Sequence, residues 1–218
     1  MKPLLIVFAF LLSGLATAGT YENLEEALIR NDSAAVIKFL DRGVDVNTVD
    51  RDGDSLLTQA VRRDLPELFE YLMQKRARLN TRNRNGETAL SIAAFTGKLN
   101  FVKPLVEGGA EINLYGWSPL AYAAFNGHHD VVDYLLKHGA KVDAKTENGS
   151  TAIFYAARFG HVSVVKLLLE HKADLDILNE NGETVVDGAM KGGNTEIEAL
   201  LREAGGRSGK SVEVDLSK

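Results

Sequence analysis

The sequence predicts an all-α solenoid of about six helix-turn-helix repeats, because three kinds of residue recur together at one spacing. Six alanines are separated by 33, 33, 30, 33 and 33 residues: Ala27, Ala60, Ala93, Ala123, Ala156 and Ala189. Four residues after each alanine stands a residue that tolerates a left-handed turn: Asn31, Asp64, Gly97, Gly127, Gly160 and Gly193. Twelve residues after each alanine stands an apolar side chain: Phe39, Leu72, Leu105, Leu135, Leu168 and Leu201. Concordant spacing of this kind is typical of stacked structural repeats.

The segment NGETALSIAAFTGKLNFVKPLVEGGAEIN shows how the elements of one repeat are expected to form. After a glycine turn, Thr88 caps a short first helix, whose small alanines allow a neighbouring helix to approach closely. Gly97 turns the chain into a second helix, and Gly109 ends that helix in the left-handed conformation. The second helix directs four apolar residues inward: Phe101, Val102, Leu105 and Val106.

In chain order, the spacing predicts repeats at about 19–49, 50–82, 83–115, 116–145, 146–178 and 179–206. The first and last repeats are expected to cap the array, because both carry charged side chains on their helices: Glu22, Glu25 and Glu26 in the first, and Glu196, Glu198 and Arg202 in the last. Residues 207–218 are small and polar, and we expect a disordered C-terminal tail there.

The N-terminal segment MKPLLIVFAFLLSGLATA predicts a secretory signal peptide of residues 1–18, cleaved after Ala18. A membrane anchor is the alternative, but the apolar run is shorter than the ~20 residues of a spanning helix. The short charged region and compact cleavage site favour a bacterial protein, so we expect a periplasmic location without membrane insertion. The remaining 200 residues contain no cysteine, so packing alone must hold the array together.

The motifs GETALSIAAFTG and NGHHDVVDYLLKHGAKVDAK resemble the ankyrin repeat, and the resemblance extends over about residues 20–206. It implies an L-shaped stack of helix pairs from which β-hairpins project to one side. Five hairpin glycines fit that pattern: Gly53, Gly86, Gly116, Gly149 and Gly182. The resemblance also implies a concave face, built from hairpins and first helices, that binds other proteins.

Two apparent functional motifs are better explained by the repeat. The run AGGRSGKS ends like a phosphate-binding loop, but a helix precedes it where that loop needs a strand, and Gly205 occupies the helix-ending position of the last repeat. His128 and His161 are 33 residues apart, and the family often has histidine there, knitting adjacent repeats. A metal site around His128 and His129 would need further ligands that the sequence does not supply. We therefore expect no catalytic residue, no cofactor and no metal.

Repeat four departs from the pattern and supplies the candidate binding site. Its hairpin lacks three residues, and Trp117 stands where the other hairpins have a small or acidic residue. Aromatic and arginine side chains dominate protein interfaces, and we expect seven to bind a partner: Trp117, Tyr115, Phe95, Phe125, Phe159, Arg62 and Arg158. The alternative is structural, with Trp117 covering a seam and Phe95 stacking on Phe125. Pro104, near the middle of a second helix, indicates that this helix starts late or bends.

After signal cleavage, 24 basic residues stand against 30 acidic ones, a balance that argues against nucleic-acid binding. We expect a non-catalytic periplasmic protein, monomeric when free, that binds another protein. The first hypothesis is an inhibitor or immunity protein that sequesters a toxic exported enzyme. The second is an accessory of oxidative-stress defence, since exported bacterial proteins similar to this one are associated with catalase. An enzyme or metal protein is the third and least favoured hypothesis.

Overall fold

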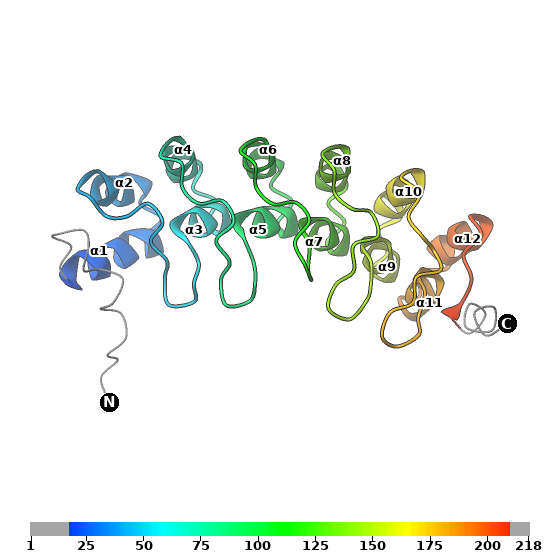
Figure 1. The fold of residues 1–218 in the computed structure, drawn as a ribbon. Coiled ribbons are helices and arrows are strands. Elements are labelled where there is room, and N and C mark those ends of the chain that lie inside the picture. The colour runs from blue at the N-terminus through cyan, green and yellow to red at the C-terminus, as the bar shows by residue number, and fades with distance from the viewer. Residues whose placement is uncertain (1–17, 210–218) are drawn as a thin grey trace, which may run out of the picture. The chain divides into compact units, whose positions relative to one another are not determined.

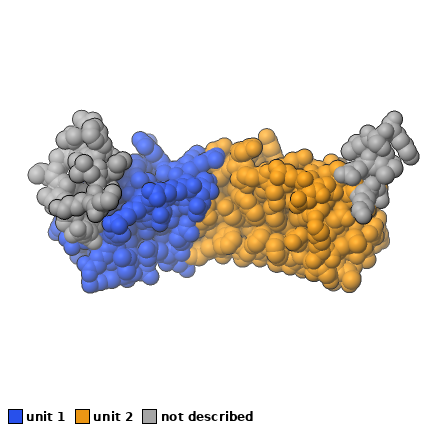
Figure 2. All heavy atoms as spheres, turned by 90° about the horizontal axis from the view of Figure 1, so that it is seen from below, with its two compact units in different colours: residues 1–86 blue, residues 87–218 orange. Residues whose placement is uncertain are grey.

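The computed structural model describes residues 18–209, and within them the chain forms twelve α-helices and no β-strand. The expected all-α repeat solenoid is therefore confirmed. The chain divides into two compact units, residues 1–86 and 87–218 (Figure 2), and each is described by itself. No helix among the described residues is both long enough and apolar enough to cross a membrane.

The first unit contains two helix pairs. Helix α1 (Ala18–Ile29) is paired with α2 (Ser33–Asp41), and α3 (Leu56–Arg62) with α4 (Pro66–Gln74). The second helices α2 and α4 pack on each other. Asp32 is the N-cap of α2 and Ser55 is the N-cap of α3. The side-chain oxygen of each accepts a hydrogen bond from the backbone N–H three residues further on.

The second unit contains four helix pairs, arranged in two rows (Figure 1). The inner row holds the first helix of each pair: α5 (Ala89–Phe95), α7 (Pro119–Phe125), α9 (Ala152–Arg158) and α11 (Val185–Lys191). The outer row holds the second helix: α6 (Leu99–Glu107), α8 (His129–Lys137), α10 (Val162–Glu170) and α12 (Thr195–Glu203). Consecutive helices pack on each other within each row, so every repeat buries its apolar surface against its neighbours.

The three recurring positions of the sequence have the structural roles that their residue types predict. The alanines of the inner helices are buried, and so are the leucines of the apolar series, although Phe39 of the first repeat is only half-buried. All six residues at the turn between paired helices have positive φ angles, from 56° at Asn31 to 81° at Gly160. Asn31 and Asp64 adopt this conformation without being glycine, as polar residues sometimes do.

The projecting hairpins of the resemblance are tight turns with hairpin hydrogen bonds rather than strands in the described part of the chain. One isolated antiparallel bridge joins Val49 to Ser55. In the equivalent loop before α9, the N–H of Thr146 donates to the carbonyl of Ser150 at 2.9 Å. The loop between α6 and α7 is narrower than its neighbours (Figure 1), in keeping with its three missing residues.

Pro104 lies inside α6, which nonetheless begins at Leu99 and has the same nine residues as α4 and α8. The expectation that this helix starts late is therefore wrong. Proline removes only one N–H donor, and the bond it would make, to the carbonyl of Asn100, belongs to the first turn of the helix. Helix formation continues because the carbonyl of Pro104 still accepts from the N–H of Gly108 at 2.9 Å.

The C-terminal glycine run is helix-ending structure as far as it is described. Gly205 has a φ of 95°, and the N–H of Gly206 donates to the carbonyl of Leu201 at 2.8 Å. The same bond joins Ala110 to Leu105 in the third repeat. Lys210 and Ser211, which complete the phosphate-loop motif, lie outside the described residues, as does the signal peptide up to residue 17.

Residues 207–209, which the sequence analysis places in the tail, are hydrogen bonded to the last repeat. The N–H of Gly209 donates to the carboxylate of Asp187 at 2.6 Å, and the hydroxyl of Thr184 donates to the carbonyl of Arg207 at 2.6 Å. Arg207 also forms an ion pair with Asp176 at 2.5 Å. These three residues belong to the packed structure, and the prediction of a disordered tail concerns residues 210–218, which are not described.

Candidate protein-binding surface

Six aromatic side chains of the second unit contact one another across three successive repeats. We call this group the aromatic ladder, and it consists of Phe95, Trp117, Tyr122, Phe125, Tyr155 and Phe159. Five of them lie on or directly after the inner helices α5, α7 and α9, and Trp117 lies in the loop before α7. Inner helices follow one another at nearly fixed spacing, so side chains at equivalent positions are brought side by side.

Trp117 is the centre of the ladder. Its ring centroid lies 5.0 Å from that of Tyr122 and 4.7 Å from that of Tyr155, with interplanar angles of 33° and 32°. Phe125 meets Trp117 edge-on at 5.7 Å. Offset and edge-on contacts at these distances are the favourable arrangements for aromatic pairs. Trp117 therefore joins repeat four to repeat five, which supports a structural role for this residue.

The two ends of the ladder are open to solvent. Phe95 is 41% exposed and contacts Tyr122 edge-on, while Phe159 is 47% exposed and contacts Phe125 at 4.5 Å. An exposed phenylalanine keeps apolar surface in contact with water. Covering that surface with a second molecule is therefore favourable. The alternative of Phe95 stacking on Phe125 is not found, because the contacts that Phe95 and Phe125 make are with other rings of the ladder.

The register of the repeats explains why aromatic side chains gather here. In repeat two, Asp54 after the loop glycine pairs with Arg62 at the end of the inner helix, at 3.0 Å. In repeat six the same two positions hold the ion pair of Glu183 with Lys191. In repeat four they hold Trp117 and Phe125, so an aromatic contact takes the place of an ion pair.

The ladder is flanked by negative charge. Burial raises the pKa of Tyr122 to about 12, and the carboxylates of Glu87 and Glu147 act in the same direction. Glu147 is exposed in the loop before α9, and its carboxylate lies directly against the backbone of Gly116. Gly116 has a φ of 81°, a backbone conformation that favours glycine, and the carboxylate of Glu147 fills the space beside it.

The remaining predicted site residues, Tyr115, Arg62 and Arg158, are not among the ring contacts of the ladder. Tyr115 is 87% exposed at the tip of the shortened loop. Arg62 belongs to the first unit and is held by Asp54. Arg158 lies at the end of α9, and its charge helps to lower the pKa of Glu183, which is lowered mainly by the hydrogen bond from Lys191.

Tyr122 and Tyr155 belong to the ladder but not to the set of site residues predicted from the sequence. Both contact Trp117, and Tyr155 is buried with its hydroxyl 3.1 Å from the side-chain oxygen of Asn148. A signal was present, because the two tyrosines are 33 residues apart and so occupy one repeat position twice.

The repeated histidines join neighbouring repeats, as predicted. The Nε2 atoms of His128 and His161 lie 2.9 Å from the carbonyl oxygens of Phe95 and Phe125, respectively. A carbonyl oxygen can only accept, so each ring donates through Nε2–H. Asn194 makes the equivalent bonds to α9 in the last repeat. Among the described residues, no group of three or more histidine, cysteine or acidic side chains is arranged to hold a metal ion.

Comparison with known proteins identifies the repeat. The family profile described as ankyrin repeats (3 copies) matches residues 24–115, 57–146 and 142–211. Ankyrin repeat and SAM domain-containing protein 6 of Rattus norvegicus is 41% identical over 78 residues, which are 34% of this chain and 9% of the rat protein. Protein phosphatase 1 regulatory subunit 27 of Mus musculus is 34% identical over 100 residues, 44% of this chain and 65% of the mouse protein.

A bacterial relative shares a longer segment. A putative ankyrin repeat protein of Rickettsia bellii is 30% identical over 129 residues, which are 52% of this chain and 36% of the Rickettsia protein. The chain thus spans less than two thirds of the length of each of these three relatives.

Proposed function

The chain belongs to the ankyrin-repeat family, and from this premise we propose that it is a non-catalytic module that binds a second protein through its aromatic ladder. Ankyrin repeats are protein-interaction modules. Among the similar proteins is a regulatory subunit of a phosphatase, a protein named for its action on another protein. The observation that carries the proposal is the exposure of Phe95 and Phe159 at the two ends of one connected group of rings.

We further propose that the protein acts in a bacterial periplasm, where it sequesters a toxic exported enzyme as an inhibitor or immunity protein. The N-terminal segment supports export, and a small acidic protein without cysteine suits such a role. The second candidate is an accessory of oxidative-stress defence associated with catalase, favoured by the resemblance to exported bacterial ankyrin-repeat proteins.

Affinity capture from a periplasmic extract of the source cell tests the binding proposal. Phe95→Ala and Phe159→Ala are the informative variants, because both side chains are about half exposed and their removal leaves the centre of the ladder in place. Truncation of an interface hot spot costs at least ~2 kcal/mol, so we expect each variant to weaken capture of the partner by about tenfold or more.

The matched control is Lys166→Ala, an exposed side chain on the outer helix α10, which should capture the partner as the native chain does. Capture that is equally strong for all three variants would remove the ladder from the interface. The captured partner then separates the two roles: an inhibitor should abolish the activity of its enzyme at a one-to-one ratio, whereas an accessory should leave catalase active.

A further inference from the structure

We propose that the partner presents an arginine side chain to the open end of the ladder at Phe95 and Tyr122, with the carboxylate of Glu147 as its counter-ion. The inference rests on the proposed function, because it names the chemistry of the partner at the same surface. Three observations carry it: the open ring surface, the position of Glu147, and the distribution of charge between the two units.

The ring surface is available at this end of the ladder. Phe95 and Tyr122 meet edge-on with centroids 5.7 Å apart, and 41% of Phe95 is exposed. Trp117 and Phe95 both contact the half-exposed ring of Tyr122, so the most exposed ring at this end is Phe95. The face of an aromatic ring is negative and attracts a cation within about 6 Å of its centroid. The exposed part of Phe95 is therefore the ring surface on which a cationic side chain of the partner would pack.

Glu147 supplies the counter-charge at a place that the shortened loop creates. Its carboxylate lies over Gly116, the residue before Trp117, and is exposed. The negative charges of Glu87, which precedes Tyr122 in the chain, and of Glu147, which follows it, both act to raise the pKa of Tyr122. Carboxylates from the loops of repeats three and five thus flank a ring that belongs to repeat four.

The charge of the chain is concentrated in the unit that carries the ladder. Residues 87–209 include sixteen acidic and eleven basic side chains, a net charge of −5, whereas residues 23–86 include eleven of each. At the other end of the ladder the basic side chains act on an acid of the chain itself. Lys191 is hydrogen bonded to Glu183, and the charge of Arg158 acts on the same carboxylate. The net charge of this unit, together with the two carboxylates that act on Tyr122, thus favours a cation at the Phe95 end.

Arginine fits this arrangement better than lysine does. Its guanidinium group is planar, stacks on aromatic rings and can form two parallel hydrogen bonds to one carboxylate. An ammonium group is a compact and strongly hydrated charge that gains less from a ring surface. An uncharged apolar side chain would cover Phe95 but would give the carboxylate of Glu147 no counter-ion.

The test uses a blocked Gly-Arg-Gly peptide as the probe, with a Gly-citrulline-Gly peptide as its uncharged counterpart. Trp117 is the single tryptophan of the chain, so its indole N–H signal in NMR spectra reports on the ladder directly. We expect the arginine peptide to shift this signal saturably and the citrulline peptide to bind at least about fivefold more weakly. Glu147→Gln should weaken the binding of the arginine peptide by about two- to fivefold, which is the range expected for the loss of one exposed ion pair.

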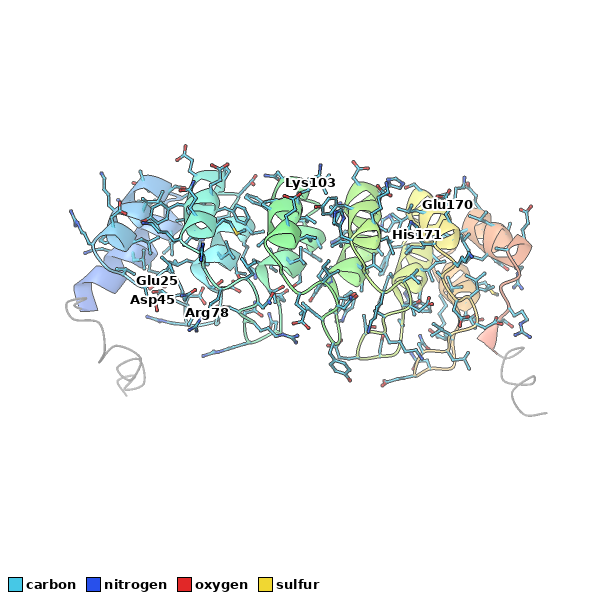
Figure 3. All side chains as sticks on the ribbon, turned by 45° about the horizontal axis from the view of Figure 1, so that its top comes forward. Glu25, Asp45, Arg78, Lys103, Glu170 and His171 are labelled. Atoms are coloured by element: carbon cyan, nitrogen blue, oxygen red, sulfur yellow. The ribbon has the colours of Figure 1, made fainter. Side chains whose placement is uncertain are left out.

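Glu170→Gln is the matched control, because Glu170 is an exposed acid on the outer helix α10, labelled in Figure 3, and should leave peptide affinity unchanged. Raising the salt concentration from about 0.05 M to about 0.5 M tests the same contact without a substitution, and should weaken the arginine peptide alone. Equal binding of the two peptides, or no effect of both Glu147→Gln and salt, would overturn the proposal. If Phe95→Ala still loses the captured partner in that case, the protein-binding function stands and only the arginine assignment falls.

Discussion

Tyr122 shows at the scale of one residue how the ladder couples ring packing to charge. Its ring is held between Trp117 and Phe95, and its hydroxyl lies in the field of two carboxylates. Both effects disfavour the phenolate, which is why the pKa of Tyr122 rises from 10.0 to about 12. A raised pKa in the folded state means that folding favours the neutral, protonated form of Tyr122 over the phenolate more than the unfolded chain does.

This predicts a dependence of stability on pH. The stabilisation from neutral Tyr122 is complete below its unfolded pKa of 10 and is lost as the pH rises from about 10 to about 12. The free energy of unfolding in urea should therefore fall less over this range for Tyr122→Phe than for the native chain. Tyr71, whose hydrogen bond to Asp41 raises its pKa to about 12, contributes equally to both proteins. Parallel curves for the two proteins would contradict the prediction.

Trp117 carries a second prediction at this scale. It contacts three rings, and aromatic pairs contribute about 0.5–1.5 kcal/mol each beyond the area they bury. Trp117→Ala should therefore lower the free energy of unfolding by about 2–3 kcal/mol, measured by chemical denaturation. Tyr115→Ala, two residues away and 87% exposed, should change it by less than about 0.5 kcal/mol. Loss of partner binding in Trp117→Ala can then be assigned to contact only after this stability change is measured.

At the scale of the helix, a fully buried leucine stands in the second helix of every repeat from the second to the sixth. Leu135 in α8 is fully buried, and α8 packs against both α6 and α10. Leu135→Ala should lower the free energy of unfolding by about 2–5 kcal/mol, the usual cost of truncating a buried leucine. Lys166→Ala on the exposed side of α10 serves as the control. A denaturation midpoint equal to that of the native chain would mean that Leu135 is not at a repeat interface.

Helices and turns could be predicted from the sequence because each depends on a few residues close together in the chain. Gly127 and Leu135 each follow Ala123 at a fixed interval, and both adopt the predicted turn and buried position. Pro104 was harder to interpret, because one lost hydrogen bond does not decide where a helix begins when its neighbours hold it in register. Packing against the inner helix α5 and the outer helix α8 fixes the place of α6 more strongly than the proline disturbs it.

The candidate site was only partly predictable for a different reason. Phe95 and Phe125 could be found because they stand at equivalent repeat positions, and Phe159 stands one position later in its own repeat. The contacts of Trp117 with Tyr122 and Tyr155 could not, since they depend on where the shortened loop places its tryptophan relative to two helices. Loop geometry of this kind follows from packing between repeats and not from local spacing.

At the scale of the whole molecule, processing of the N-terminus is the remaining prediction. The small residues Ala16 and Ala18 define a cleavage site, so the mature chain should begin at or next to Gly19. The intact mass of protein recovered from the periplasmic fraction measures this directly. Full-length protein recovered from the cytoplasm would refute both the cleavage and the proposed location.

The short segment 206–209 also bears on whether copies of the chain can stack end to end. A row of stacked helix pairs ends only where its last repeat presents a face on which no further repeat can stack. Here Gly209 lies so close to the carbonyl of Gly182 that no loop of another molecule can occupy that place. Head-to-tail contacts that repeat without closing produce fibres. Residues 206–209 therefore fill the place beside the last loop that a further repeat would need for head-to-tail stacking.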